Sequence, residues 1–264
     1  MAERAPAPLR KRFGRHFLAD DAVVDAIIAL VAPAAGDHIL EIGPGGGVLT
    51  APLAASGAHL EVVEIDRDLA AWLAGRFGGS ERFVLHNQDV LKFDFARLPA
   101  VAGGWKVVGN LPYNISTPLL MRLLEEAGRL RELTLMVQRE VGERLAAAPA
   151  TAAYGRLGVM AQRRARIALR LEVPPHSFEP PPKVDSAVVQ LYPSAGPFAA
   201  DFERDFAEVV RLAFGARRKT LANALKRRLA GAQMEALGID PGSRAEVLSV
   251  DDFVRLTAAL REHA

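Results

Sequence analysis

The chain has 264 residues, of which 50% are hydrophobic and 24% are charged, with a formal net charge of +2 and no cysteine. This balance excludes a mostly disordered chain, and the lack of cysteine excludes a disulfide scaffold, cysteine-ligated zinc and a thiol nucleophile. No apolar run approaches the ~20 residues of a membrane span, and the basic start has no apolar signal-peptide core, so we expect a soluble cytoplasmic protein that does not bind a membrane.

Helices and strands are predicted to alternate through the first three quarters of the chain. After a basic arm, Asp20 and Asp21 begin a helix whose apolar residues recur at helical spacing. Short apolar runs that read as strands follow at 38–42, 60–65, 82–85, 106–109, 133–138, 167–173 and 187–192. Because helix-length segments separate the strands, we predict βαβ units in an open, mainly parallel sheet with helices on both faces.

The end of the chain has a different pattern. A stretch of proline, glycine and serine over 193–197 predicts a linker. Beyond it, 202–214, 220–229 and 251–260 are helical and no strand is predicted. We therefore predict an α/β domain over residues 1–193, which includes the basic arm, and a small all-helical domain over residues 194–264.

A glycine-rich turn directly follows the first strand of the predicted sheet, where residues 41–47 read E-I-G-P-G-G-G. A dinucleotide-binding fingerprint requires a third glycine where Val48 stands, and the lysine of a phosphate-binding loop is also absent. Glycines such as Gly43 and Gly45 let the backbone pass close to a ligand. On its own, the turn is equally typical of an α/β protein that binds nothing there.

Two acidic residues favour the binding interpretation. Glu64 ends the second strand and Asp89 follows the third. An acid at the first position can accept both hydroxyls of a ribose, and one at the second can meet an adenine amino group. These residues predict a site for an adenosine with no phosphate requirement. S-adenosylmethionine fits, because its cationic sulfonium tolerates acidic surroundings.

The loop after the fourth strand carries the residues suited to chemistry, Asn110-Leu111-Pro112-Tyr113. The side-chain oxygen of Asn110 and the Leu111 carbonyl could hold the N–H groups of an exocyclic adenine nitrogen, and Pro112 stiffens the turn. Tyr113 offers a ring on which an extracted base could stack, and Phe178 could close its other face. Such a transfer depends on positioning and on stabilising the developing positive charge, with no general base needed before attack. The alternative is a structural turn whose aromatic residue packs on the core.

Opposite charges are segregated along the chain. Only six of the 33 basic residues are lysine, and the basic residues concentrate in 10–15, 156–170 and 209–234, whereas 37–100 holds nine acids and five bases. Arginine is well matched to phosphate, so these segments favour a nucleic-acid partner over solvated helix faces. The residues that we expect to contact RNA are Arg10, Lys11, Arg12, Arg217, Arg218 and Lys219.

Motifs in order over nearly the whole chain resemble the ribosomal RNA adenine dimethyltransferase family, in its bacterial small-subunit type. They lie at residues 11–18, 41–45, 63–66, 88–90, 110–116, 137–141, 154–157, 182–186 and 217–221. The resemblance implies a class I, Rossmann-like S-adenosylmethionine-dependent methyltransferase fold. It also implies dimethylation at N6 of two adjacent adenosines near the 3′ end of small-subunit rRNA during ribosome biogenesis. The cofactor contacts that it implies are His16, Leu18, Gly43, Glu64, Asp89 and Asn110, and we expect Gly45 of the glycine-rich turn to join them.

Two other functions remain open from the residues alone. A non-catalytic ribosome-assembly factor could share the fold, although it would have no need of an intact Asn-Leu-Pro-Tyr turn. A small-molecule methyltransferase would leave the arginine segments without a role. We expect a monomer that acts on small-subunit rRNA or an immature small subunit. The six histidines show no ligand spacing, so we expect no metal.

Overall fold

The computed structural model describes residues 16–194, 196, 199–215 and 219–262. The strands are β1 (Phe17–Leu18), β2 (His38–Ile42), β3 (His59–Val63), β4 (Phe83–His86), β5 (Trp105–Asn110), β6 (Leu130–Gln138), β7 (Ala165–Val173), β8 (Phe178–Glu179) and β9 (Ser186–Pro193). The α-helices are α1 (Asp21–Val31), α2 (Thr50–Ala55), α3 (Arg67–Phe77), α4 (Ser116–Glu125), α5 (Arg139–Ala146), α6 (Arg156–Gln162), α7 (Ala200–Phe214), α8 (Leu221–Leu225), α9 (Gly231–Ala236) and α10 (Val250–Glu262). None of the described helices is both long enough and apolar enough to cross a membrane.

The seven predicted strands form one sheet in the order β4-β3-β2-β5-β6-β9-β7. The pairs β2–β3, β3–β4, β2–β5 and β5–β6 are parallel, and β6–β9 is antiparallel. The prediction of an open, mainly parallel sheet is therefore confirmed. The chain runs outward from β2 to β4 and then returns to β5 on the other side of β2. In open α/β sheets, ligands bind at the carboxyl ends of the strands where the order reverses in this way.

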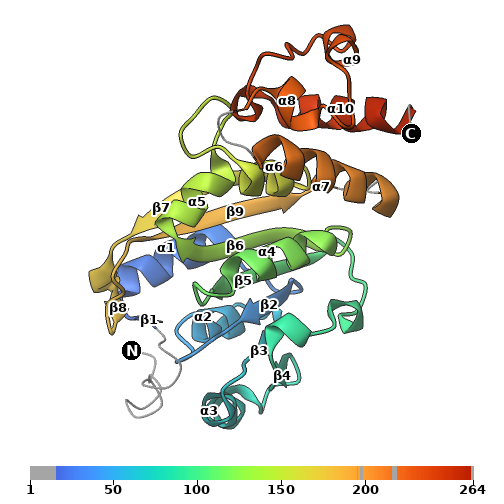
Figure 1. Ribbon diagram of the computed structural model, residues 1–264. Helices are drawn as coiled ribbons and strands as arrows, with labels where there is room; N and C mark the ends of the chain where they lie inside the picture. The colour runs from blue at the N-terminus through green and yellow to red at the C-terminus, as the bar shows by residue number, and fades with distance from the viewer. Residues whose placement is uncertain (1–15, 195, 197–198, 216–218, 263–264) are drawn as a thin grey trace. The chain divides into compact units, whose positions relative to one another are not determined.

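Helices cover both faces of the sheet; in Figure 1, α1 lies behind it and α4 in front. Asp20 caps α1, since its Oδ1 accepts hydrogen bonds from the backbone N–H groups of Ala22 at 3.0 Å and Val23 at 3.4 Å. The apolar face of α1 packs into the core through Val24, Ile27 and Val31. Burial of each such side chain contributes ~1.5–3 kcal/mol, so the helix is held mainly by this face.

A two-stranded antiparallel ribbon of β1 and β8 joins the start of the described chain to the segment before β9. Leu18 pairs with Phe178, and Phe17 pairs with Glu179. Ser177 Oγ donates to the capping residue Asp20 at 2.9 Å, which fixes the ribbon to the start of α1. Strands of two residues leave no periodic pattern, which is why the sequence did not predict them.

The chain divides into two compact units, one of residues 1–142 and 168–194, the other of 143–167 and 195–264. The second unit therefore contains 143–167 in addition to the segment predicted as a helical domain. Its apolar core joins Tyr154 and Val159 to Phe206 and Phe253. The buried Glu203 of α7 accepts a hydrogen bond from Arg163 at 2.9 Å. These tertiary contacts, which a linker signal at 193–197 cannot reveal, bring 143–167 together with the C-terminal helices.

The helices of the second unit differ in detail from the sequence prediction. The segment predicted as a helix over 220–229 forms α8 only as far as Leu225, and a turn follows in which Arg228 N donates to the Leu225 carbonyl at 2.7 Å. Helix α9, which the sequence did not predict, begins at Gly231 and is only six residues long. Both are too short for helical periodicity to define their ends.

Candidate active site

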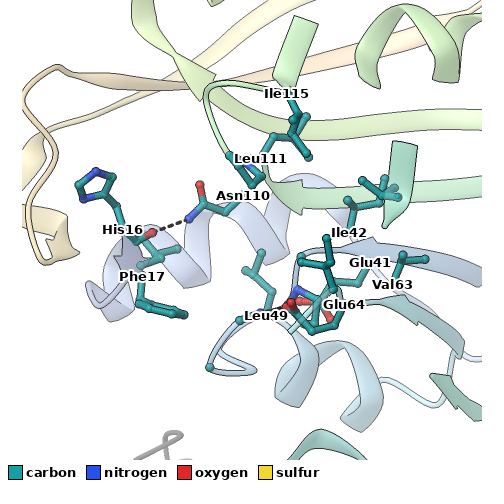
Figure 2. A pocket seen from close by; sticks show the side chains of 18 of the residues that line it. His16, Phe17, Glu41, Ile42, Leu49, Val63, Glu64, Asn110, Leu111 and Ile115 are labelled. Carbon is teal, nitrogen blue, oxygen red and sulfur yellow. Dashed lines mark hydrogen bonds between the residues drawn. The ribbon is translucent and has the colours of Figure 1, made fainter. Parts of the chain in front are cut away.

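A cavity of about 500 Å³ opens at the carboxyl ends of β2, β3 and β5 (Figure 2), at the reversal of strand order. This volume is in the range of small-molecule sites. The described residues that line it are His16, Phe17, Leu18, Glu41, Ile42, Gly43, Pro44, Gly45, Gly46, Val48, Leu49, Val63, Glu64, Ile65, Gln88, Asp89, Val90, Leu91, Asn110, Leu111, Pro112, Tyr113, Asn114 and Ile115. Three carboxyl groups are among them, and the described lining includes no lysine or arginine.

The glycine-rich turn brings the backbone close to β1. Gly45 has a φ of +54°, in the left-handed region that favours glycine, and an added Cβ would lie 2.9 Å from Cε1 of Phe17. Only glycine therefore allows Phe17 to cover the turn. The turn is anchored from below, because Gly43 N donates to the Val63 carbonyl at 2.9 Å. The turn is therefore closely packed where it lines one end of the cavity.

Glu64 ties the turn to the end of β3. Its Oε2 accepts from Gly45 N at 3.3 Å, and its Oε1 accepts from Asp66 N at 2.8 Å. Asp66 in turn caps α3 by accepting from Asp68 N at 3.0 Å. Glu64 is 1% exposed, so its carboxylate orientation is set by these backbone donors.

Glu41 is a second buried carboxyl group beneath the turn. Burial raises its pKa to about 8; Thr50 opposes this shift and the charge of Glu64 adds to it. Its Oε2 has no hydrogen-bond partner among the described residues. Glu41 is therefore largely protonated at neutral pH.

The loop that follows β5 depends on a close approach of two backbones. A Cβ at Gly109 would lie 2.6 Å from the Ile42 carbonyl oxygen, so only glycine lets β5 end this close to β2. Asn110 follows at once, and its Nδ2 donates to the His16 carbonyl at 3.1 Å. Figure 2 shows the Asn110 side-chain oxygen turned away from that bond. One donor of the amide thus holds the segment at β1, while the acceptor oxygen is not used by His16.

Tyr113 is held beside this group. Its hydroxyl is 2.7 Å from Ser186 Oγ, and Ser116 Oγ donates to its backbone carbonyl at 3.1 Å. Its ring centroid lies 6.1 Å from that of His16, with 26° between the planes. Burial raises the pKa of the Tyr113 hydroxyl, so the hydroxyl stays neutral and can donate or accept a hydrogen bond.

The structure brings most of the predicted site residues together. All of the predicted cofactor contacts line the cavity, as do Leu111, Pro112 and Tyr113. Phe178 is not among the described lining residues; it is 4% exposed and packs in the core with α1. Of the predicted RNA contacts, Arg10, Lys11, Arg12, Arg217 and Arg218 lie outside the described residues, and Lys219 is exposed.

Several site residues were not selected from the sequence. Glu41 lies in the glycine-rich motif, and an acidic side chain in an otherwise apolar strand is the signal that indicates it. Gly109 could have been found as a glycine inside a predicted strand, which often marks close backbone approach. Phe17 and Ser186 lie in the motifs at 11–18 and 182–186, but no local pattern indicates their roles, which depend on contacts with residues distant in the chain. No group of three or more potential metal ligands occurs among the residues in described positions.

The strand order and the position of the cavity define a Rossmann-like fold of the class I methyltransferase type. The ribosomal RNA adenine dimethylase family matches residues 7–262, and the chain belongs to this family. It is 49% identical over 263 residues to ribosomal RNA small subunit methyltransferase A of Pseudomonas fluorescens, covering 99% of this chain and 97% of the relative. It is 52% identical to the protein of the same name from Thiobacillus denitrificans, covering 95% of this chain and 97% of the relative.

Two solved structures have the same fold over most of the chain. A dimethyladenosine transferase from Plasmodium falciparum matches with a TM-score of 0.83 and 26% identity, covering 94% of this chain and 98% of that one. The 23S rRNA methyltransferase ErmE matches with a TM-score of 0.72 and 26% identity, covering 93% and 99%. The predicted family and fold class are confirmed.

Proposed function

We infer that this protein transfers methyl groups from S-adenosylmethionine to the N6 amino groups of adenosines in small-subunit rRNA, giving N6,N6-dimethyladenosine. Membership of the family and the close relatives support this function. In the structure, the main support for this function is that the acidic cavity and the Asn-Leu-Pro-Tyr loop lie together at one edge of the sheet. A methyl donor and an adenine acceptor must meet at such a point.

The described residues fit S-adenosylmethionine. Glu64 and Asp89 stand at the ends of successive strand units, where we propose that they contact the ribose and the adenine of the cofactor. The lack of a described lysine or arginine in the lining favours a cationic ligand. We propose that His16, Leu18, Gly43, Gly45 and Asn110 complete its contacts. When bound, S-adenosylmethionine supplies the methyl group as an electrophile.

The chain's own residues then position the acceptor nitrogen. We propose that the Asn110 side-chain oxygen and the Leu111 carbonyl accept hydrogen bonds from the adenine amino group, with Pro112 holding the turn. As the nitrogen gains positive charge, both acceptors bind its hydrogens more strongly, which lowers the barrier. The existing bond from Asn110 to His16 fixes which way the amide points, so its oxygen is free for this role.

Tyr113 provides the surface on which we propose that the extracted base stacks. The half-buried ring lies on the same loop as Asn110, so a base stacked there presents its amino group to the acceptors. We further propose that Phe178 covers the other face of the base. Because Phe178 is buried, this role requires its ring to turn out of the core when the base enters.

The second unit is proposed to bind RNA. Arg211 donates to Glu208 at 2.7 Å, and this bond together with the charges of Arg228 and Arg156 holds the pKa of Glu208 below its ordinary value. These three arginines are exposed and share the single carboxylate of Glu208, and Lys219 is also exposed. This surface suits a phosphate backbone. We propose that the basic residues at 10–12 and 217–218, which lie outside the described residues, also contact RNA.

The cellular substrate is proposed to be a small subunit that is still being assembled. Methylation requires a base that can leave its stack, and bases are more accessible before the particle is complete. We propose that the protein acts as a monomer. Because small subunits of bacteria are assembled in the cytoplasm, we propose that the protein acts there.

Transfer of a labelled methyl group to small-subunit rRNA tests this function. We expect the wild-type protein to label the RNA, and Asn110→Ala to lose transfer while it remains folded, with a melting temperature lowered by only a few degrees through loss of the bond to His16. Rising salt should reduce transfer steeply, because phosphate contacts release counterions. Retained transfer by Asn110→Ala would overturn the proposed role of Asn110. Transfer that does not respond to salt would contradict RNA binding through phosphate contacts.

A further inference from the structure

The ring of Tyr113 is fixed by a residue that is distant in the chain. Tyr113 OH and Ser186 Oγ are 2.7 Å apart, although the residues are separated by 73 positions. Ser186 is the first residue of β9 and is 0% exposed. Through the β6–β9 pair it stands opposite Gln138, while Met136 of β6 stands beside Asn110. The serine hydroxyl therefore lies at the same sheet edge as the reactive loop.

The backbone of Tyr113 is held independently of this bond. Ser116 Oγ donates to the Tyr113 carbonyl at 3.1 Å, and Ile115 N donates to the Pro112 carbonyl at 3.0 Å. These bonds set the start of the side chain but leave the ring able to swing about its Cα–Cβ bond. A hydrogen bond at the hydroxyl, at the far end of the ring, restrains that swing without occupying a face of the ring. Ser186 thus restrains the rotation of the Tyr113 ring, which the backbone hydrogen bonds of the loop do not restrain.

We propose that Ser186 is a positioning residue, which holds the Tyr113 ring at the angle where the target adenine stacks with its amino group toward Asn110. This role rests on the proposed function of Tyr113 as the stacking platform. Ser186 itself is not among the described residues that line the cavity, so it does not contact the proposed cofactor. A base on a ring that swings freely would spend less time in the reactive position, and kcat would fall.

The choice of side chains supports this role. Both hydroxyl groups are removed from bulk water to a large extent, so each needs a partner, and the two satisfy each other. Because burial keeps the Tyr113 hydroxyl neutral, the bond persists at the pH at which the reaction runs. Phenylalanine would stack equally well at position 113, so the hydroxyl of Tyr113 serves the bond to Ser186 and not the stacking itself.

The test compares Ser186→Ala, Tyr113→Phe and the double variant with the wild-type protein in methyl transfer to small-subunit rRNA. Loss of one hydrogen bond should lower the population of the reactive ring position about fivefold. We therefore expect each single variant to lower kcat about fivefold with an unchanged KM for S-adenosylmethionine. The double variant should lose about fivefold as well, because both changes remove the same bond. RNA with 2-aminopurine at the target position should be quenched less by the variants, since the base stacks less fully.

Two control variants lose a comparable hydroxyl bond elsewhere. In Tyr154→Phe the lost donor is the buried hydroxyl that bonds to the Leu248 carbonyl at 2.8 Å, and in Ser56→Ala it is the hydroxyl that bonds to the Leu53 carbonyl at 2.6 Å. Both should keep the wild-type kcat. A kcat for Ser186→Ala within twofold of wild type, or losses that multiply in the double variant, would overturn the positioning role. If the wild-type protein transfers no methyl group, the proposed function itself fails, and that outcome is distinguishable from the others.

Discussion

Gly109→Ala tests whether the site depends on the close approach of β2 and β5. The added Cβ would lie 2.6 Å from the Ile42 carbonyl oxygen, whereas ordinary contact begins at 3.4 Å. The two strand ends must therefore separate by about 0.8 Å. Overpacking of this kind costs ~1–3 kcal/mol, which corresponds to a fall in Tm of roughly 2–12 °C for a chain of this size.

The same displacement moves Asn110, which directly follows Gly109. A misplacement on the order of 1 Å can reduce a rate by about a hundredfold, so kcat should fall by about that factor even where the protein remains folded. Thermal melting and transfer of a labelled methyl group measure the two effects. Gly75→Ala is the matched control: nothing lies within 4 Å of its added Cβ in α3, so we expect unchanged activity and a gain of ~0.5–1 kcal/mol. Wild-type Tm and kcat in Gly109→Ala would refute the reasoning.

Two further predictions concern stability. Glu41 has a pKa near 4.5 when unfolded and about 8 when folded, so its contribution to stability is complete below pH 4.5 and is lost as the pH rises to about 8. Glu41→Gln cannot ionise and should not show this loss. The free energy of unfolding of Glu41→Gln minus that of the wild-type protein should therefore rise between pH 4.5 and 8, by at most about 5 kcal/mol. Chemical denaturation at each pH measures the difference, and a difference that does not change with pH would contradict the prediction. In the second unit, Glu203→Ala removes the carboxylate that accepts from Arg163 at 2.9 Å and lies 3.5 Å from Arg164. We expect the free energy of unfolding in denaturant to fall by about 3 kcal/mol, and an unchanged midpoint would show that the ion pairs do not hold the residues after α6 to α7.

The parts of the fold that sequence predicts well are those set by local patterns. The seven strands of the main sheet were expected within a few residues of their observed bounds, because each is an apolar run of ordinary length. Asp20 as a helix cap and the glycine-rich turn are likewise local features. The order of the strands, with β9 antiparallel beside β6, was not predicted, because connection rules narrow the possible topologies without selecting one.

The parts that sequence did not predict depend on tertiary contacts. The segment 143–167 lies inside the predicted first domain, yet it packs with the C-terminal helices through Val159 and Arg163. The burial of Phe178 in the same apolar cluster as Leu18 was not expected from the sequence, and the stacking role proposed for Phe178 therefore requires its ring to leave that cluster. The bond between Tyr113 and Ser186 joins residues 73 positions apart, which no local pattern can indicate.

Mass spectrometry of small-subunit rRNA methylated by this protein in vitro tests the central claim most directly, because it identifies the bases and the number of methyl groups together. We predict two adjacent adenosines near the 3′ end, each carrying two methyl groups on N6, and no modification with Asn110→Ala. Methylation at other bases, a single methyl group per adenosine at completion, or the same modification by Asn110→Ala would contradict the account.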